Sequence, residues 1–268
     1  MVAISANQPR ATPGRKRVRL TARDLALLEL AAEHRLLLAD HAQALLGASP
    51  SAVAARLRVL VGSRLLQRER TFQGESSCYR ITRRGLAAVG SSLPAPRMDL
   101  QSYDHDIGLA WLWLAARNGK LGEVREIVSE RTMRSQDGAS EPAATKLGVR
   151  LGGLGSGGRP RLHYPDLLLR MASGHQVAVE LELSGKTRAR REKILMGYAA
   201  DRRIDAVLYL VERRSVGHEV AATARKLGIS SMVQVQLARR GESGRRPQSG
   251  LQRRPTRMRP AQEAVPVQ

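Results

Sequence analysis

The stretch VAVELELS, residues 177–184, is the part of the sequence that most restricts the fold of this chain. Apolar side chains alternate there with Ala178, Glu180, Glu182 and Ser184, which is the period-two pattern of a β-strand. Since successive side chains of a strand point to opposite faces, both glutamates lie on one face, about 7 Å apart. A buried carboxylate without a partner costs several kcal/mol or becomes protonated, so these two glutamates need a partner.

Strand and helix patterns alternate through the second half of the chain, which predicts an α/β (α+β) domain with a mixed sheet. The Gly-rich residues 135–160 are expected to form a loop. We predict strands at 124–130, 165–171, 176–184, 205–212 and 231–237, and helices at 103–119, 187–203 and 215–228.

The first half has the pattern of a winged helix-turn-helix. Thr21 is the expected N-cap of a first helix, a short helix covers 39–46, and Ser49 followed by Pro50 begins a third. Two strand-like segments, 65–72 and 76–82, then flank a turn that contains Gly74, and a closing helix follows at 82–90.

These patterns divide the chain into five parts. We expect a disordered basic arm (1–19), a winged helix-turn-helix DNA-binding domain (20–90), a Pro/Ser linker (91–102), an α/β domain (103–237) and a disordered Arg-rich tail (238–268).

The charge balance indicates a nucleic-acid partner: 45 lysines and arginines face 24 aspartates and glutamates, a net charge of +21. An anionic membrane surface is the weaker alternative. The single cysteine, Cys78, leaves no disulfide framework and no zinc finger, and the 3% aromatic content does not favour base-stacking platforms. The sequence has no apolar leader and no run of about 18 apolar residues, so we expect a cytoplasmic protein without membrane attachment.

Double-stranded DNA is the expected partner of the first domain. The exposed side of the third helix and the two strands after it would contact the duplex, while Arg56 could instead form an internal ion pair. The candidate DNA-binding residues are Ser51, Ala52, Arg56, Arg58, Arg68 and Arg70.

A cluster of acidic residues is expected in the second domain. Asp166 begins a strand that the turn SGH brings back beside VAVELELS, so Asp166 and Glu180 can face each other on neighbouring strands. Glu182 lies on the same side, and Lys186 follows at the strand-to-helix junction. Two carboxylates suit Mg²⁺ or Mn²⁺, and a metal-bound water facing a phosphodiester is a nucleophile.

PD at 165–166, then VELE at 179–182 after a short hairpin, resembles the PD-(D/E)XK nuclease superfamily. With the winged helix, HYPDLLLR and VAVELELSGKTRARREKILMGY resemble the replication-relaxation family of actinobacterial plasmids and mobile elements, over about residues 20–237. The resemblance implies plasmid replication and DNA relaxation, with Asp166 and Glu180 as metal ligands and Glu182 and Lys186 as further catalytic residues. A replication or conjugation protein and a second copy of the chain are further candidate partners.

One position departs from that pattern, because the superfamily lysine two residues after the second acid is Glu182 here. Lys186 could replace it from the helix junction. Alternatively the site has decayed, and both glutamates form a solvated salt-bridge face with Arg188, Arg190 or Arg191. A metal-dependent endonuclease or nickase and a non-catalytic DNA-binding regulator or replication accessory factor both stay open.

Other motifs in the sequence give weaker indications of function. Gly153, Gly155 and Gly158 match GxGxxG, but no helix pattern follows to hold a phosphate. The six histidines include no pair typical of a tyrosine relaxase. His105 is either a metal ligand or a surface residue beside an N-capping Asp104, and His163 either lines the cleft or is structural. Tyr198 at helical spacing is expected in the core.

Overall fold

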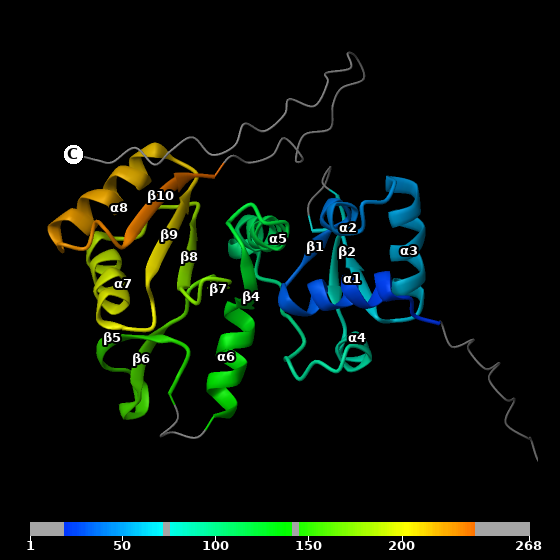
Figure 1. Ribbon diagram of the computed structural model, residues 1–268. Coiled ribbons are helices and arrows are strands. Elements are labelled where there is room, and N and C mark those ends of the chain that lie inside the picture. Colours follow the sequence, from blue (N-terminus) through cyan, green and yellow to red (C-terminus); the bar gives the residue numbers. More distant parts are fainter. Residues whose placement is uncertain (1–18, 72–75, 141–144, 239–268) are drawn as a thin grey trace, which may run out of the picture.

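The computed structural model describes residues 19–71, 76–140 and 145–238. The chain is a mixed α/β protein with a helical N-terminal part and a second part built on a five-stranded mixed sheet (Figure 1). The predicted α/β class with a mixed sheet is therefore confirmed. The expected disordered arm and tail lie outside the described residues, except for Arg19 and Ala238, and so does the turn at Gly74.

Capping residues set the helix boundaries of the N-terminal part, as the sequence predicts. Thr21 caps the first helix and Ser49 caps the third, while Gly47 ends the second in the left-handed conformation at φ 58°. A short strand before the second helix completes a three-stranded sheet of order β1-β3-β2. The elements are α1 (Ala22–Glu33), β1 (Leu37–Leu38), α2 (Ala39–Leu46), α3 (Pro50–Gly62), β2 (Leu66–Glu69), β3 (Cys78–Ile81) and α4 (Arg83–Ala88).

The second part contains a sheet of order β10-β9-β8-β7-β4. The central strand β8 pairs antiparallel with β7 and parallel with β9, so β8 is buried on both faces. The predicted strands and helices are confirmed: β4 (Val124–Ser129), β7 (Leu167–Met171), β8 (Gln176–Glu182), β9 (Ala206–Val211), β10 (Val233–Leu237), α5 (Tyr103–Arg117), α7 (Arg188–Ala200) and α8 (Arg214–Lys226).

The expected loop at 135–160 is wrong. A helix, α6 (Glu130–Ala139), begins at the N-cap Ser129, and a hairpin of β5 (Val149–Leu154) and β6 (Pro160–His163) follows. The glycines of this region do not break the hairpin, because Gly152 and Gly153 adopt positive φ where the register of the two strands shifts. The GxGxxG stretch ends in a three-residue 3-10 turn, Ser156–Gly158, and β6 rather than an α-helix follows it, as expected.

The two faces of the five-stranded sheet are covered by different elements. Alternate residues of β7 and β8, such as Leu167 and Val179, belong to a core shared with α5. Their neighbours Leu168 and Ala178 belong to a second core, which includes α7 and α8. The β5–β6 hairpin packs beside α7, where Gly197 lies against the Arg150 carbonyl. Glu180 follows the parity of Ala178 and so faces the α7 side.

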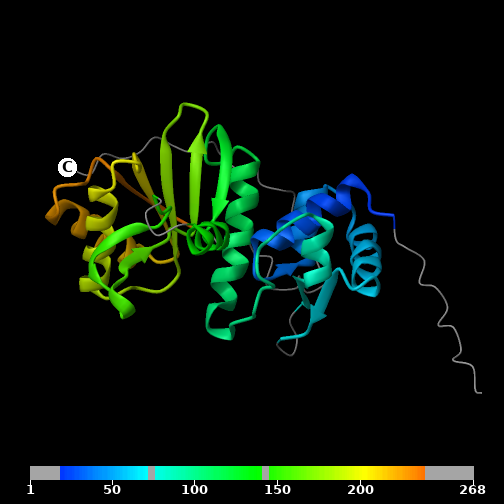
Figure 2. The same ribbon diagram turned by 90° about the horizontal axis from the view of Figure 1, so that it is seen from below.

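The core on the α5 side continues into the N-terminal part. Figure 2 shows α5 standing between the five-stranded sheet and the N-terminal helices. Leu27 and Leu60 of the N-terminal part belong to the same buried cluster as Trp113 of α5 and Val179 of β8. Burial of apolar surface therefore holds the two parts together, in addition to the chain connection between them.

Polar contacts add to this junction. Glu33 accepts hydrogen bonds from the Ser129 hydroxyl at 2.5 Å and the Thr132 hydroxyl at 2.8 Å. Arg35 forms ion pairs with Asp106 at 3.4 Å and Glu130 at 3.6 Å. Both sets join the end of α1 to the second part.

Within the described residues no single helix is long and apolar enough to cross a membrane. Only α2 and α3 taken together reach that length and composition, and these two helices are bent by 112°.

Candidate functional site

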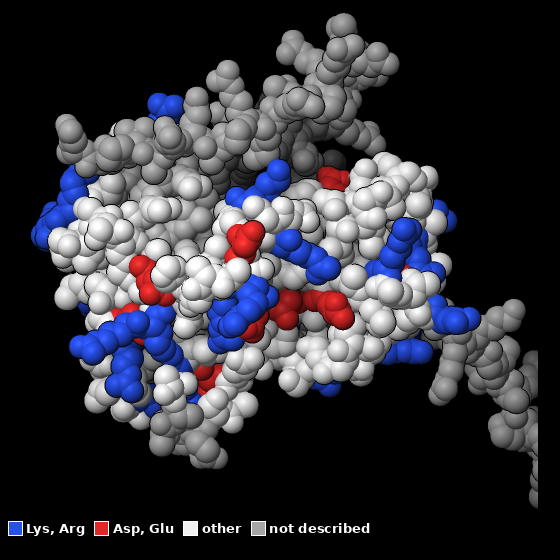
Figure 3. Space-filling model, in the orientation of Figure 1, with Lys and Arg blue, Asp and Glu red and all other residues white. Residues whose placement is uncertain are grey.

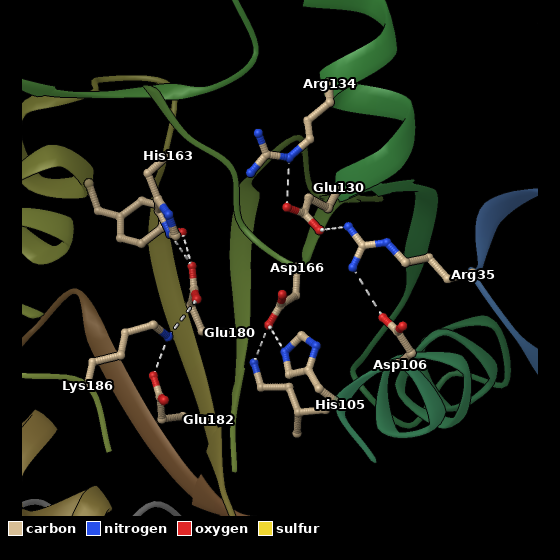
Figure 4. Close-up of polar contacts among 12 residues, drawn as sticks. Arg35, His105, Asp106, Glu130, Arg134, His163, Asp166, Glu180, Glu182 and Lys186 are labelled. Carbon is tan, nitrogen blue, oxygen red and sulfur yellow. Dashed lines mark hydrogen bonds and ion pairs between the residues drawn. The ribbon is translucent and has the colours of Figure 1, made fainter. Parts of the chain in front are cut away.

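Strand pairing brings the predicted acidic residues together. The antiparallel register pairs Leu167 of β7 with Val179 of β8, so Asp166, which directly precedes β7, comes next to Glu180 at the end of this pairing. Glu182 follows on the same side of β8. Figure 4 shows these three carboxylates on neighbouring strands, with Lys186 beside Glu180 and Glu182.

Glu180 is held by donors from three elements. His163 Nε2, at the end of β6, lies 2.6 Å from Glu180 Oε1, and the Tyr198 hydroxyl of α7 donates to the same oxygen. Lys186 Nζ lies 3.7 Å from Oε2. Burial raises the pKa of Glu180, but His163, Lys186 and Tyr198 outweigh it, and the resulting pKa lies below the ordinary value. Glu180, only 2% exposed, is therefore an ionised buried carboxylate.

Asp166 has a different environment. Its Oδ2 accepts hydrogen bonds from the Leu181 backbone N–H at 2.7 Å and from His105 Nε2 at 3.2 Å. Burial raises the pKa of Asp166, and the Glu180 charge adds to the rise against the His105 hydrogen bond. The pKa of His105 is raised, because contact with Asp166 outweighs burial. The two carboxylates thus have pKa values shifted in opposite directions, an arrangement typical of acid–base pairs.

Lys186 is the cation of the cluster. It forms an ion pair with Glu182, and these contacts, with the Glu180 charge, outweigh burial and raise the pKa of Lys186. Burial raises the pKa of Glu182 against the effect of Lys186. Lys186 therefore reaches the acids from the helix junction, as expected.

The alternative of a solvated salt-bridge face is wrong. Glu180 and Glu182 are buried, and neither pairs with an arginine of α7 among the described residues. Arg188 instead pairs with Glu192 at 3.0 Å, and Arg191 pairs with Glu219 at 2.9 Å.

Asp166 and Glu180 are the two carboxylates that would hold a divalent cation, with few protein ligands between them. Both hydrogen bonds to Asp166 use Oδ2 and both hydrogen bonds to Glu180 use Oε1, while Glu180 Oε2 faces Lys186 Nζ at 3.7 Å. Mg²⁺ takes one or two carboxylates and completes its shell with water. A metal needing three side-chain ligands does not fit, because the described residues contain no such group of His, Cys, Asp or Glu.

The predicted DNA-binding residues lie on the N-terminal part, away from this cluster (Figure 1). Ser51, Ala52 and Arg58 are exposed on α3, and Arg68 and Arg70 are exposed on and just after β2. Arg56 differs from the rest, because its guanidinium forms a two-contact ion pair with the buried Asp24 of α1. The internal ion pair that the sequence leaves open for Arg56 is thus present.

Sequence reasoning undervalued two residues of the site. Tyr198 is buried in the core, as predicted, but its hydroxyl also reaches Glu180. His105 contacts Asp166 from α5, 61 residues earlier in the chain. Ser102, not Asp104, is the N-cap of α5. The only signal for the two contacts was a polar group among the apolar residues of each helix, His105 on α5 and Tyr198 after Ile194 and Leu195 on α7.

The chain was compared with family models, curated proteins and solved structures, and no match was found in any of the three.

Proposed function

We propose that this chain is a DNA-binding protein that nicks DNA at the acidic cluster, in replication and DNA relaxation of a plasmid or mobile element. In this proposal residues 20–90 are a winged helix-turn-helix and residues 103–237 a PD-(D/E)XK-like domain, which places the chain in the replication-relaxation family. The order of elements supports it: helices and a hairpin come first, and a mixed sheet flanked by helices follows. The partner is double-stranded DNA, in the cytoplasm.

One observation carries the proposal: Asp166 and Glu180 lie next to each other at the end of the β7–β8 pairing, with Lys186 Nζ 3.7 Å from Glu180 Oε2. Burying a carboxylate lowers the stability of the fold unless the carboxylate is paired, and proteins commonly keep such buried charges at functional sites. Two acids and a lysine at one place suit metal-assisted phosphodiester hydrolysis.

Asp166 and Glu180 would hold Mg²⁺ or Mn²⁺. When bound, such an ion neutralises phosphate charge and makes a bound water more acidic. Lys186 would stabilise the negative charge that develops on the phosphate, and Glu182 would keep Lys186 in place. His163 and Tyr198 hold Glu180 ionised and fixed, and His105 orients Asp166.

The N-terminal part would dock the duplex. Arg58, Arg68 and Arg70 are exposed cations on α3 and around β2, suited to phosphate contacts, while Ser51 and Ala52 let α3 approach a groove closely.

A non-catalytic DNA-binding regulator or replication accessory factor is the second candidate. It is favoured by the observation that all three carboxylates already have protein partners, with Lys186 placed between Glu180 and Glu182. A cluster satisfied in this way can serve as a structural network without a metal.

Supercoiled plasmid separates the two candidates. The full chain is incubated with plasmid and Mg²⁺ or Mn²⁺, and relaxed product and retarded bands are measured for the wild type, Asp166→Asn and Glu180→Gln. Glu126→Gln is the matched control, because Glu126 is an exposed carboxylate paired with Arg170 on the sheet. If the wild type and Glu126→Gln nick the plasmid and the other two variants do not, the nuclease is supported. If the plasmid is retarded but not nicked, the regulator is supported.

A further inference from the structure

A basic hollow lies between the β5–β6 hairpin and α7. It has a volume of about 610 Å³, and its walls include Arg161 from β6 and Arg190 and Lys193 from α7. Figure 3 shows Lys and Arg side chains gathered at the lower left of the molecule, over the region of β5 and β6. Among the described lining residues there is no acidic side chain.

The three cations of the hollow lack the partners that neighbouring arginines have. In the described ranges Arg161, Arg190 and Lys193 are exposed and make no ion pair. On the same helix, Arg188 is paired with Glu192 and Arg191 with Glu219. On α7 the protein thus pairs Arg188 and Arg191 internally but leaves Arg190 and Lys193, which line the hollow, without an acidic partner among the described residues. Unpaired convergent cations are suited to a polyanion.

Apart from Leu151, the remaining residues that line the hollow are small. Gly152 and Gly153 carry no side chain, and both adopt positive φ, at 74° and 67°, so that the β5 backbone turns away from regular pairing. Ala189 is the neighbour on the α7 side. A chain of phosphates can therefore approach both backbones closely. The described lining has no aromatic side chain, so it offers contacts to a backbone and none for base stacking.

The elements that form the hollow are also the elements that hold Glu180. His163 lies two residues after Arg161, on the same side of β6, and contacts Glu180 at 2.6 Å. Tyr198 contacts Glu180 from α7, the helix that carries Arg190 and Lys193. A polyanion in the hollow would lie beside the acidic cluster.

We infer that the hollow between the β5–β6 hairpin and α7 binds consecutive phosphates of a DNA strand through Arg161, Arg190 and Lys193. This inference rests on the proposed function and adds a second DNA contact to that of the N-terminal part. Because backbone contacts carry no base information, binding there is independent of sequence.

The test measures how the affinity of the full chain for a short fluorescent duplex depends on salt, by anisotropy in EDTA. Wild type is compared with the triple variant Arg161→Ala, Arg190→Ala, Lys193→Ala. The matched control is Arg125→Ala, Arg202→Ala, Arg225→Ala, which removes the same charge from exposed arginines outside the hollow and without ion pairs in the described structure. Loss of three phosphate contacts makes the negative slope of log K against log salt less steep by about 2 to 3.

A fall of that size in the hollow variant, with a change below about 1 in the control, supports the inference. Equal changes in both variants overturn it, because binding would then depend on net charge alone. ATP binding by the wild type and the hollow variant is measured as well. If the hollow variant loses ATP binding while its salt slope for the duplex is unchanged, the inference is overturned, because the hollow would then bind a free nucleotide.

The outcome is separable from that of the nicking experiment. EDTA prevents metal-dependent cleavage, and Asp166→Asn should bind duplex as the wild type does. If the hollow variant has a less steep salt dependence but the wild type does not nick, the DNA contact in the hollow stands and the nuclease proposal fails. If the wild type nicks and the hollow variant and its control have equal salt slopes, the nuclease proposal stands and the contact in the hollow fails.

Discussion

The hydroxyl of Tyr198 donates a hydrogen bond to Glu180 Oε1 although 18 residues separate them and both side chains are buried. Tyr209 lies opposite Glu180 in the parallel pair of β8 and β9, and its buried hydroxyl has no hydrogen-bond partner in the described part of the chain. Tyr198 therefore donates a hydrogen bond to the acidic cluster and Tyr209 does not, so the same Tyr→Phe change at the two positions can be compared.

Tyr198→Phe should lower the free energy of unfolding by about 1–3 kcal/mol, because an ionised buried carboxylate loses a donor. Tyr209→Phe should change it by less than about 1 kcal/mol, since that hydroxyl makes no bond. Losing the donor also raises the pKa of Glu180, so the acid limb of nicking should move to higher pH in Tyr198→Phe alone. Urea unfolding and a pH–rate profile measure both effects; equal destabilisation by the two variants would count against a role for Tyr198.

Arg56 and Arg58 should behave differently although both are on α3. Arg56→Ala leaves the buried Asp24 without its cation and should cost about 1–3 kcal/mol of stability. Arg58 is exposed and makes no ion pair within the described residues, so Arg58→Ala should leave stability within about 0.5 kcal/mol. It should weaken duplex binding and lower the salt slope by about 0.9. Thermal unfolding and anisotropy separate these effects, and identical behaviour of both variants would contradict the assignment.

The secondary structure around the site could largely be predicted from the sequence, because apolar alternation and capping residues are local signals. Period-two alternation identified β8, and the short SGH turn fixed its pairing with β7, which placed Asp166 opposite Glu180. The caps Thr21 and Ser49 set the starts of α1 and α3.

The β5–β6 hairpin and the contacts of His105 and Tyr198 with the acids could not be predicted. Glycines that usually mark loops here occupy positive-φ positions inside the hairpin, so the local pattern indicated no strand. His105 and Tyr198 reach the acids through tertiary packing of α5 and α7 on the sheet. Helical periodicity assigns such residues to a face but does not give their polar partner.

His34 should make the stability depend on pH. It is buried against Trp113, with the ring centroids 6.1 Å apart, and burial lowers the pKa of His34 to about 3, with the charges of His41 and Arg131 adding to the shift. An unfolded histidine has a pKa near 6.5, so below that pH the unfolded state binds the extra proton and stability falls as the pH falls. The loss from His34 should reach about 2 kcal/mol at pH 5.

Comparison with His34→Phe isolates this effect. Burial raises the pKa of the nearby Asp106 to about 6, so protonation of Asp106 acts in the opposite direction in both proteins. The difference in unfolding free energy between pH 7 and pH 5 should therefore be about 2 kcal/mol smaller in the variant. Urea titrations at both pH values measure it, and the same acid loss in both proteins would contradict a neutral buried His34.

Binding of Mn²⁺ to the full chain, measured by isothermal titration calorimetry without DNA, tests most directly whether Asp166 and Glu180 share a cation. The wild type and the control Glu126→Gln should bind with similar affinity, while Asp166→Asn and Glu180→Gln should each bind at least about tenfold more weakly, since each removes one of two carboxylate ligands. Equal Mn²⁺ affinity in all four proteins, or no binding by the wild type, would contradict a shared cation at this site.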